Sequence, residues 1–99
     1  MALTRFLHIG DYARFKILIH MRHQNKPETP ILVAARVGLT IITTYRAMQI
    51  LERCGYIEHA LPIFHYKNQK WYQITPKGYE IAVPIGLLLE LDERQRQRT

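Results

Sequence analysis

The sequence predicts a small α+β domain that is mainly α-helical, with one two-stranded hairpin. Three observations lead to this prediction: a tight turn at residues 38–40 between two apolar segments, a helix stop at Gly55, and a β-favouring segment at 71–74 that precedes a helix start at Thr75-Pro76. In this order they describe a winged helix-turn-helix, in which one helix projects from a small core.

The first predicted helix runs from about Tyr12 to His23, and Gly10-Asp11 supplies the expected break and N-cap before it. Its apolar residues form two stripes, so we expect it to have two neighbours. One stripe consists of Ile17, Leu18 and Met21. The other, on a different face, consists of Tyr12, Phe15 and Ile19.

The helix-turn-helix is predicted next. Thr29-Pro30 provides an N-cap and a first-turn proline, so a short helix follows over about 30–37. Gly38 can take a positive φ and end that helix, and Thr40 caps a second helix from Ile41 to about Cys54. The inward face of the second helix consists of Thr44, Met48 and Leu51. Its outward residues are Ile42, Thr43, Arg46, Gln49 and Arg53.

Residues 61–75 are predicted to form the wing. The segments 62–66 and 71–74 are rich in β-favouring residues and are expected to pair as a hairpin. Between them, Lys67-Asn68-Gln69-Lys70 is interpreted as a turn that carries two lysines at its tip.

The last helix is predicted to open at Thr75-Pro76, and Pro84 is expected to kink or interrupt it because proline lacks the N–H for the helical ladder. Residues 1–83 would be the winged-helix part, and 84–99 a C-terminal dimerisation helix and polar tail of the same single domain. The run at 85–91 is more apolar than one small domain can cover, so a two-fold dimer is expected, the alternative being that this segment folds back onto its own domain. The predicted dimer interface consists of Tyr12, Phe15, Ile19, Ile85, Leu88 and Leu91.

The chain carries a formal net charge of +6. The excess lies in residues 1–79, which are net +7, whereas residues 80–99 are net −1. Such a field attracts polyanions, so nucleic acid is the leading partner and an acidic protein surface the next. A single cysteine agrees with a reducing compartment, and no apolar run approaches the roughly 20 residues that span a bilayer. We therefore expect a cytoplasmic, nucleoid-associated protein with no membrane partner.

Three segments resemble the small winged-helix transcription regulators of the MarR and PadR type. Residues 33–40 look like their second helix and turn, 51–57 like the end of their recognition helix, and 71–78 like their wing exit. The resemblance covers roughly residues 11–83 and implies a dimeric, sequence-specific DNA-binding regulator. Its recognition helix would enter the major groove, and its wing would touch the backbone or minor groove. The chain departs from these families at four positions where they usually have polar residues, namely Ile31, Leu32, Ile41 and Ile42.

Candidate DNA contacts lie on the predicted recognition helix and wing. Arg46 can bond two acceptors on guanine, and Thr43 or Ile42 can meet a thymine methyl group. Lysines at a hairpin tip are natural phosphate ligands, although they also occur there for solubility alone. The predicted DNA-binding residues are Ile42, Thr43, Tyr45, Arg46, Gln49, Arg53, Lys67, Lys70 and Lys77.

Other functions remain open at this point. A plasmid or phage partition or replication adaptor would use the same fold on repeated DNA sites. A protein-interaction winged helix would instead dock through an apolar patch formed by Ile31, Leu32, Ile41 and Ile42. Cys54, His59 and His65 match no strong metal-ligand spacing, so neither a metal nor a cofactor is expected. The acidic residues are scattered and no glycine-rich phosphate cradle is present, so an enzyme is not expected either.

Overall fold

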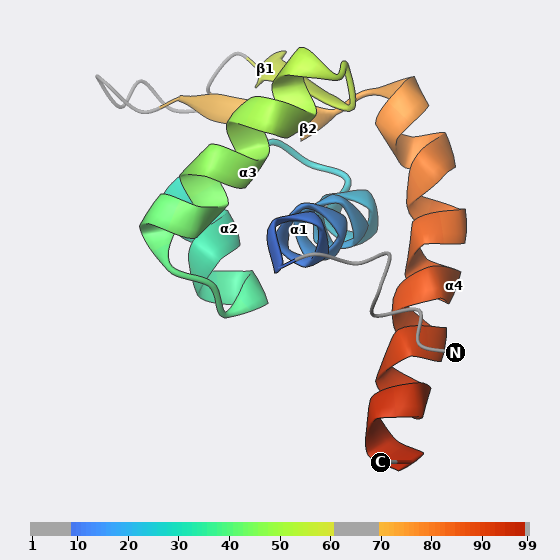
Figure 1. Cartoon of the computed structure of the whole chain (residues 1–99). Coiled ribbons are helices and arrows are strands. Elements are labelled where there is room, and N and C mark those ends of the chain that lie inside the picture. Colours follow the sequence, from blue (N-terminus) through green and yellow to red (C-terminus); the bar gives the residue numbers. More distant parts are fainter. Residues whose placement is uncertain (1–8, 61–69, 99) are drawn as a thin grey trace.

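Helix α1 (Ile9–Gln24) runs through the middle of the fold in the computed structural model, which describes residues 9–60 and 70–98 (Figure 1). Helices α2 (Pro30–Val37) and α3 (Ile41–Arg53) lie on one side of α1, and α4 (Pro76–Arg98) lies on the other. Strands β1 (Ile57–Ala60) and β2 (Trp71–Ile74) lie across one end. This order is the predicted winged helix-turn-helix.

The core forms around the first predicted stripe of α1, because Ile17, Leu18 and Met21 are fully buried. Every other described element contributes to this core, because each has an apolar face that must leave water. From α2 to α4 the buried residues are Val33, Ala47, Met48, Leu51, Ile57, Tyr72, Ala82 and Ile85.

The caps of the helix-turn-helix are as predicted. The Thr29 hydroxyl accepts a hydrogen bond from the Leu32 N–H at 3.3 Å, and the Thr40 hydroxyl accepts one from the Thr43 N–H at 3.1 Å. Gly38 has φ 73°, a left-handed conformation that a glycine adopts without the clash of a Cβ atom. Local sequence therefore fixes where α2 ends and α3 begins.

The strand pairing differs from the prediction. β2 pairs antiparallel with β1, with Ile57 opposite Ile74 and Ala60 opposite Trp71, so the expected pairing of 71–74 with 62–66 is wrong. β-propensity marks residues that tolerate a strand, whereas register is set by burial, here that of Ile57 on β1 and Tyr72 on β2. Residues 62–66 and Lys67 lie outside the described residues.

Two helix boundaries also differ. α1 begins at Ile9, so Gly10-Asp11 lies inside the first turn of the helix rather than before it. α4 continues through Pro84 to Arg98, so the expected interruption is wrong. Pro84 is exposed, and the buried residues on either side, Ala82 and Ile85, keep both halves of the helix packed in the same core.

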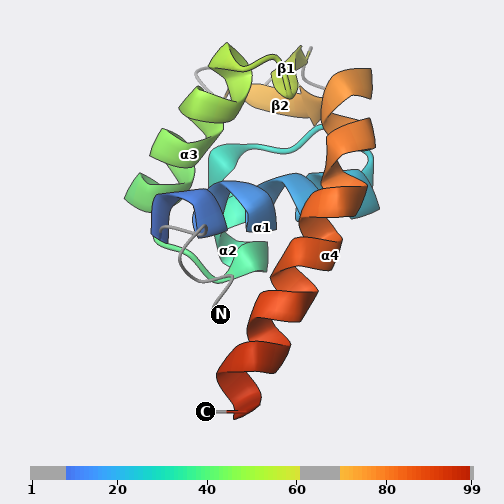
Figure 2. The same ribbon diagram turned by 45° about the vertical axis from the view of Figure 1, so that its right-hand side comes forward.

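The C-terminal half of α4 extends beyond the rest of the fold (Figure 2). No single helix in residues 9–60 and 70–98 is long and apolar enough to cross a membrane. The pair α2 and α3 reaches that length and composition together, but its two helices are bent by 115°.

Candidate nucleic-acid interface

The outward face of α3 carries a stripe that consists of Ile42, Arg46, Gln49 and Arg53, which we call the reading stripe. Its members are spaced at i, i+4, i+7 and i+11, so they lie on one side of the helix, opposite the buried face that includes Met48. Ile42, Arg46 and Arg53 are exposed, and Gln49 is half-buried. Within the described parts of the chain, neither guanidinium group makes a hydrogen bond or an ion pair.

The first turn of α3 presents apolar side chains to solvent. Ile42 is 66% exposed and Ile41 is 55% exposed. The two threonines beside them bond to each other, because the Thr40 hydroxyl donates to the Thr43 hydroxyl oxygen at 2.8 Å while it accepts from the Thr43 N–H. Cap formation therefore occupies much of the hydrogen-bonding capacity of this turn.

Lys70 and Lys77 differ in their surroundings although both are exposed. The Nζ atom of Lys77 donates to the carbonyl oxygen of Cys54 at 2.8 Å and lies 4.9 Å from the centre of the Tyr56 ring. Lys70 directly precedes β2 and makes no such contact within residues 9–60 and 70–98. Lys77 thus stabilises the end of α3, and Lys70 is the more available of the two for a phosphate group.

The sheet is joined to α3 by side chains from β1 and β2. His59 Nε2 lies 2.8 Å from Glu52 Oε2, and the His59 ring centre lies 4.7 Å from that of Tyr72. Burial, with smaller contributions from Glu52 and Tyr45, raises the pKa of Tyr72 above its ordinary value of 10.0. Tyr72 is therefore neutral at physiological pH.

The described residues contain no group of three potential ligands that could hold a metal ion. His65 lies outside them.

A buried carboxylate positions the helix-turn-helix against the rest of the fold. Glu28 is 1% exposed, with Oε1 2.9 Å from His20 Nε2 on α1 and Oε2 3.3 Å from Arg36 Nε on α2. Its backbone forms a bridge to Tyr72, with N–H···O distances of 2.9 and 2.8 Å. No local sequence pattern shows that the Glu28 side chain is buried, so sequence reasoning did not identify it.

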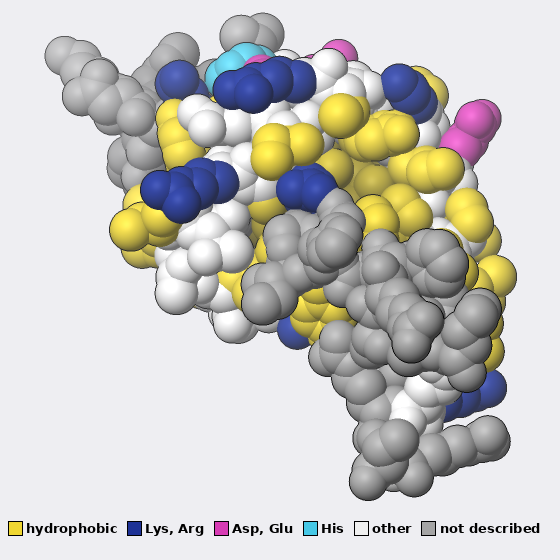
Figure 3. All heavy atoms as spheres, in the orientation of Figure 1, with side chains coloured by type: hydrophobic (Ala, Val, Ile, Leu, Met, Phe, Trp, Pro, Cys, Tyr) yellow, Lys and Arg dark blue, Asp and Glu magenta, His cyan; other side chains and the backbone are white. Residues whose placement is uncertain are grey.

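The apolar side chains of α4 divide into two groups. Ile85, which was predicted to lie in the dimer interface, and Leu89 are buried in the core of the same chain. For this side of the helix, the structure matches the predicted alternative, in which the segment folds back onto its own domain. The outer side remains apolar, and Figure 3 shows yellow side chains gathered over this region. Its members, which are 40–59% exposed, are Tyr79, Val83, Leu87, Leu88 and Leu91.

The predicted interface residues on α1 are half-buried. Phe15 and Ile19 pack against the core, and Tyr12 donates from its hydroxyl to Glu93 Oε1 on α4 at 3.4 Å. Tyr12 and Ile19 therefore lie against α4 of the same chain, with Ile19 beside Gly86.

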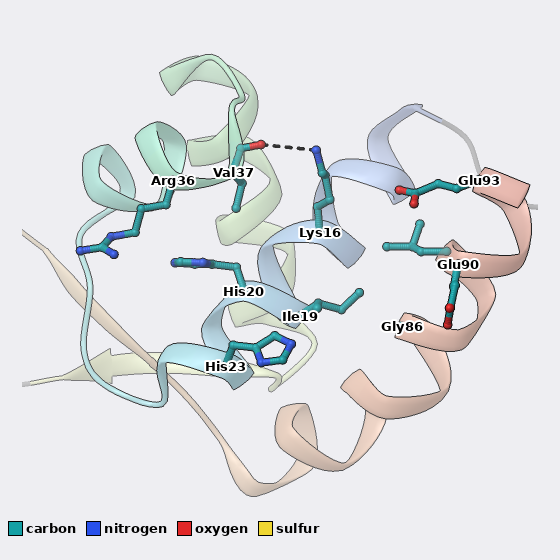
Figure 4. A pocket seen from close by; sticks show the side chains of 10 residues that line it. Lys16, Ile19, His20, His23, Arg36, Val37, Gly86, Glu90 and Glu93 are labelled. Atoms are coloured by element: carbon teal, nitrogen blue, oxygen red, sulfur yellow. Dashed lines mark hydrogen bonds between the residues drawn. The ribbon is translucent and has the colours of Figure 1, made fainter. Parts of the chain in front are cut away.

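A pocket of about 510 Å³ opens between α1, α2 and α4 (Figure 4). Lys16, His20 and Arg36 line it from α1 and α2, whereas Glu90 and Glu93 line it from α4. Lys16 is already engaged, since its Nζ donates to the Val37 carbonyl oxygen at 3.4 Å. The pocket therefore has basic side chains on one wall and acidic side chains on the other.

Several solved structures share this fold. ZitR from Lactococcus lactis, in a variant in apo form, aligns with a TM-score of 0.70 over 96% of this chain and 70% of its own, at 15% identity. The transcriptional regulator BldR from Sulfolobus solfataricus aligns with a TM-score of 0.71 over 86% of this chain and 59% of its own, at 21% identity. A variant of MarR from E. coli complexed with operator DNA aligns with a TM-score of 0.67 over 85% of this chain and 59% of its own, at 24% identity.

These likenesses establish the winged helix-turn-helix fold. They confirm the resemblance to MarR-type regulators at the level of the fold. The chain spans between 59% and 70% of the length of the three proteins. No protein-family model matches the sequence, and no curated protein matches it.

Proposed function

We propose that this chain is a sequence-specific double-stranded DNA-binding protein that acts as a homodimeric transcriptional regulator. The observation that carries the proposal is the reading stripe, which presents two guanidinium groups without partners among the described residues on a helix that projects from a firmly capped turn. Groups of this kind, when exposed on a projecting helix, match the acceptor atoms along the major groove.

The three polar members of the stripe have hydrogen-bonding roles in this proposal. Arg46 bonds O6 and N7 of a guanine, Gln49 reads a neighbouring base edge, and Arg53 reaches a base or phosphate near the end of the helix. At a rise of about 1.5 Å per residue, the stripe is roughly 16 Å long, which matches about five base-pair steps. Tyr45, which is exposed beside the stripe, contacts a sugar or a base.

The wing and the net charge supply the contacts that do not depend on sequence. Lys67 and Lys70 would bind phosphates or the minor groove next to the site of α3. The positive charge of residues 1–79 would speed the encounter with DNA and make the affinity fall steeply with salt. Lys77 contributes mainly by holding the end of α3, since its ammonium group already has partners.

The proposed dimer uses the outer side of α4. Leu88 and Leu91 are 40% and 48% exposed in the single chain, and a second copy would remove them from water. A two-fold pair would place two copies of α3 on half-sites about one helical turn apart. A protein with this function would bind chromosomal DNA, so a cytoplasmic, nucleoid-associated location is part of the same proposal.

The fold supports this function, because MarR from E. coli was solved with operator DNA on the same architecture. Selection of bound duplexes from a random pool, followed by footprinting and by affinity measurements over a range of salt concentrations, tests it. We expect one pseudo-palindromic sequence and a steep linear fall of log affinity with log salt. Tandem copies of the selected site in partition or replication regions would favour the adaptor role. Failure to select any sequence, with a shallow salt dependence, would favour a protein partner at Ile31, Leu32, Ile41 and Ile42.

A further inference from the structure

We propose that the first turn of α3 recognises the C5-methyl group of a pyrimidine, so that each half-site carries thymine or 5-methylcytosine opposite Ile42. This inference rests on the proposed function, namely that α3 reads duplex DNA. It makes the methyl group the feature that the first turn of α3 selects, and it assigns that selection to Ile42 rather than to Thr43.

Exposure is the first argument. Ile42 is the most exposed of the large apolar side chains in the described residues, and its neighbour Ile41 is also more than half exposed. Neither is needed in the core, and a β-branched residue is not the choice that favours a helix. Two isoleucines at the exposed start of a capped helix therefore point to an apolar group outside the chain.

The hydrogen-bonding groups of the turn are the second argument. The hydroxyl of Thr40 donates to that of Thr43 and accepts from its N–H, so both side chains are engaged in the cap. Apart from the Thr43 hydroxyl hydrogen and the backbone N–H groups at the start of the helix, this turn offers methyl and methylene groups to a base edge. In the major groove, the apolar feature that a base pair presents is the C5-methyl group of thymine.

The rest of the reading stripe indicates that DNA covers this turn, rather than an apolar protein surface. Ile42 is on the same side of α3 as Arg46 and Arg53, one and three turns further along. A protein that buried Ile42 with an apolar surface would also remove these guanidinium groups from water, which is costly without anionic partners. A DNA groove offers methyl groups, base acceptors and phosphates together.

Helix geometry adds a constraint on the site. Ile42 and Arg46 are four residues apart, a rise of about 6 Å, which corresponds to roughly two base-pair steps. We therefore expect the methyl-bearing pyrimidine and the guanine bound by Arg46 to be within about two base pairs of each other.

The test uses the full chain and a duplex selected from the random pool. Each thymine of a half-site is replaced in turn by deoxyuridine, which lacks only the methyl group. At one position we expect the affinity of the unchanged protein to fall about fourfold, the value for one buried methyl-sized group.

Ile42→Ala should bind the thymine and deoxyuridine duplexes equally well. The matched control, Ile31→Ala, removes an equally apolar, exposed side chain from α2 and should keep the fourfold ratio.

A second arm separates the methyl group from the rest of thymine. The sensitive T·A pair is replaced by a C·G pair whose cytosine either carries or lacks a 5-methyl group. We expect the unchanged protein to bind the methylated duplex about fourfold more tightly than the unmethylated one. Ile42→Ala should bind the two duplexes equally well. Equal binding of thymine and deoxyuridine duplexes at every position would overturn the inference, as would an unchanged ratio in Ile42→Ala. A thymine preference without any gain from 5-methylcytosine would also overturn it. Failure of the pool to yield any bound duplex would instead contradict the proposed function itself.

Discussion

The Nζ atom of Lys77 lies 2.8 Å from the carbonyl oxygen of Cys54, so the first turn of α4 caps the C-terminal end of α3. A second bond joins the same segments, because the Thr75 hydroxyl donates to the Gly55 carbonyl oxygen at 2.7 Å. A cation at this position also interacts favourably with the helix dipole. The orientation of α3 thus depends on a residue 23 positions beyond Cys54, the C-cap of the helix.

This relationship predicts different effects for two exposed lysines. Lys77→Gln should destabilise the fold by about 1 kcal/mol, because it removes a charged donor from the end of α3. Lys70→Gln should leave stability unchanged and lower the slope of log affinity against log salt by about one. Thermal unfolding and salt titration measure the two effects. If Lys77→Gln lowers the salt slope without any loss of stability, Lys77 binds phosphate and the assigned capping role is wrong.

Arg46→Ala should cost roughly 1–3 kcal/mol of DNA-binding free energy and relax the preference at one base pair per half-site, because a bidentate contact with guanine is lost. Binding assays with the selected duplex and its single-base variants measure both effects. Arg94→Ala is the matched control, since Arg94 is an exposed arginine on α4 that pairs with Glu90. An Arg46→Ala protein with unchanged affinity and preference would show that α3 does not read the sequence.

Replacement of both Leu88 and Leu91 by alanine should shift the protein from dimer to monomer, because truncation of a leucine that is buried in the dimer costs roughly 2–5 kcal/mol. Affinity for the full palindrome should fall as well, since the two half-site contacts are no longer linked. Light scattering and binding assays follow the two changes. Ile50→Ala, a substitution at an exposed apolar residue of α3, should keep the dimer. A double variant that stays folded and dimeric would move the interface elsewhere.

Two glycines of α4 should respond in opposite ways to alanine. At Gly78 a Cβ atom would collide with the carbonyl oxygen of Tyr56, so Gly78→Ala should destabilise the fold by about 1–3 kcal/mol. At Gly86 the nearest atom is Ile19 Cδ1 at 3.8 Å, an ordinary contact. Gly86→Ala should therefore stabilise the fold by about 0.5–1 kcal/mol through helix propensity. Denaturant unfolding measures both variants, and equal stabilities would contradict the close approach of α4 to Tyr56.

Tyr72 should make stability fall at high pH. Its pKa is raised in the folded state, so the folded protein holds the phenolic proton more tightly than the unfolded chain does. This contribution is fully present below the ordinary pKa of 10.0 and is lost as the pH rises through the folded value. Absorbance titration should show one tyrosine that ionises after the others, and Tyr72→Phe should remove that late phase. A titration curve that is the same in Tyr72→Phe would contradict the assignment.

The sequence predicted those parts of the fold that local chemistry determines. Thr29, Thr40 and Gly38 carry their signals within a few residues, and the structure confirms each of them. The period of α3 likewise separated its buried face from the reading stripe. These features are predictable because caps and amphipathic faces depend on neighbours along the chain.

The sequence could not predict features that depend on distant contacts. β2 pairs with β1 because this pairing places Ile57 of β1 in the core. The continuity of α4 through Pro84 likewise depends on packing against α1. The burial of Glu28 follows from His20 and Arg36, which lie eight residues away on opposite sides along the sequence. A contact between an exposed residue of α3 and DNA would depend on the position of the bound duplex, which neither the helix period nor the caps determine.

The bridge between Glu28 and Tyr72 has a consequence for synthesis on the ribosome. Every residue of α2 and α3 has been translated once Arg53 is added, yet the strand that pairs with Glu28 begins only at Trp71, and the cap at Cys54 needs Lys77. A nascent chain that stops before these residues lacks the contacts that fix α3 relative to α1. In the proposed function, α3 therefore reaches the position it needs for DNA binding only after residues 71–77 have been synthesised and have packed against it.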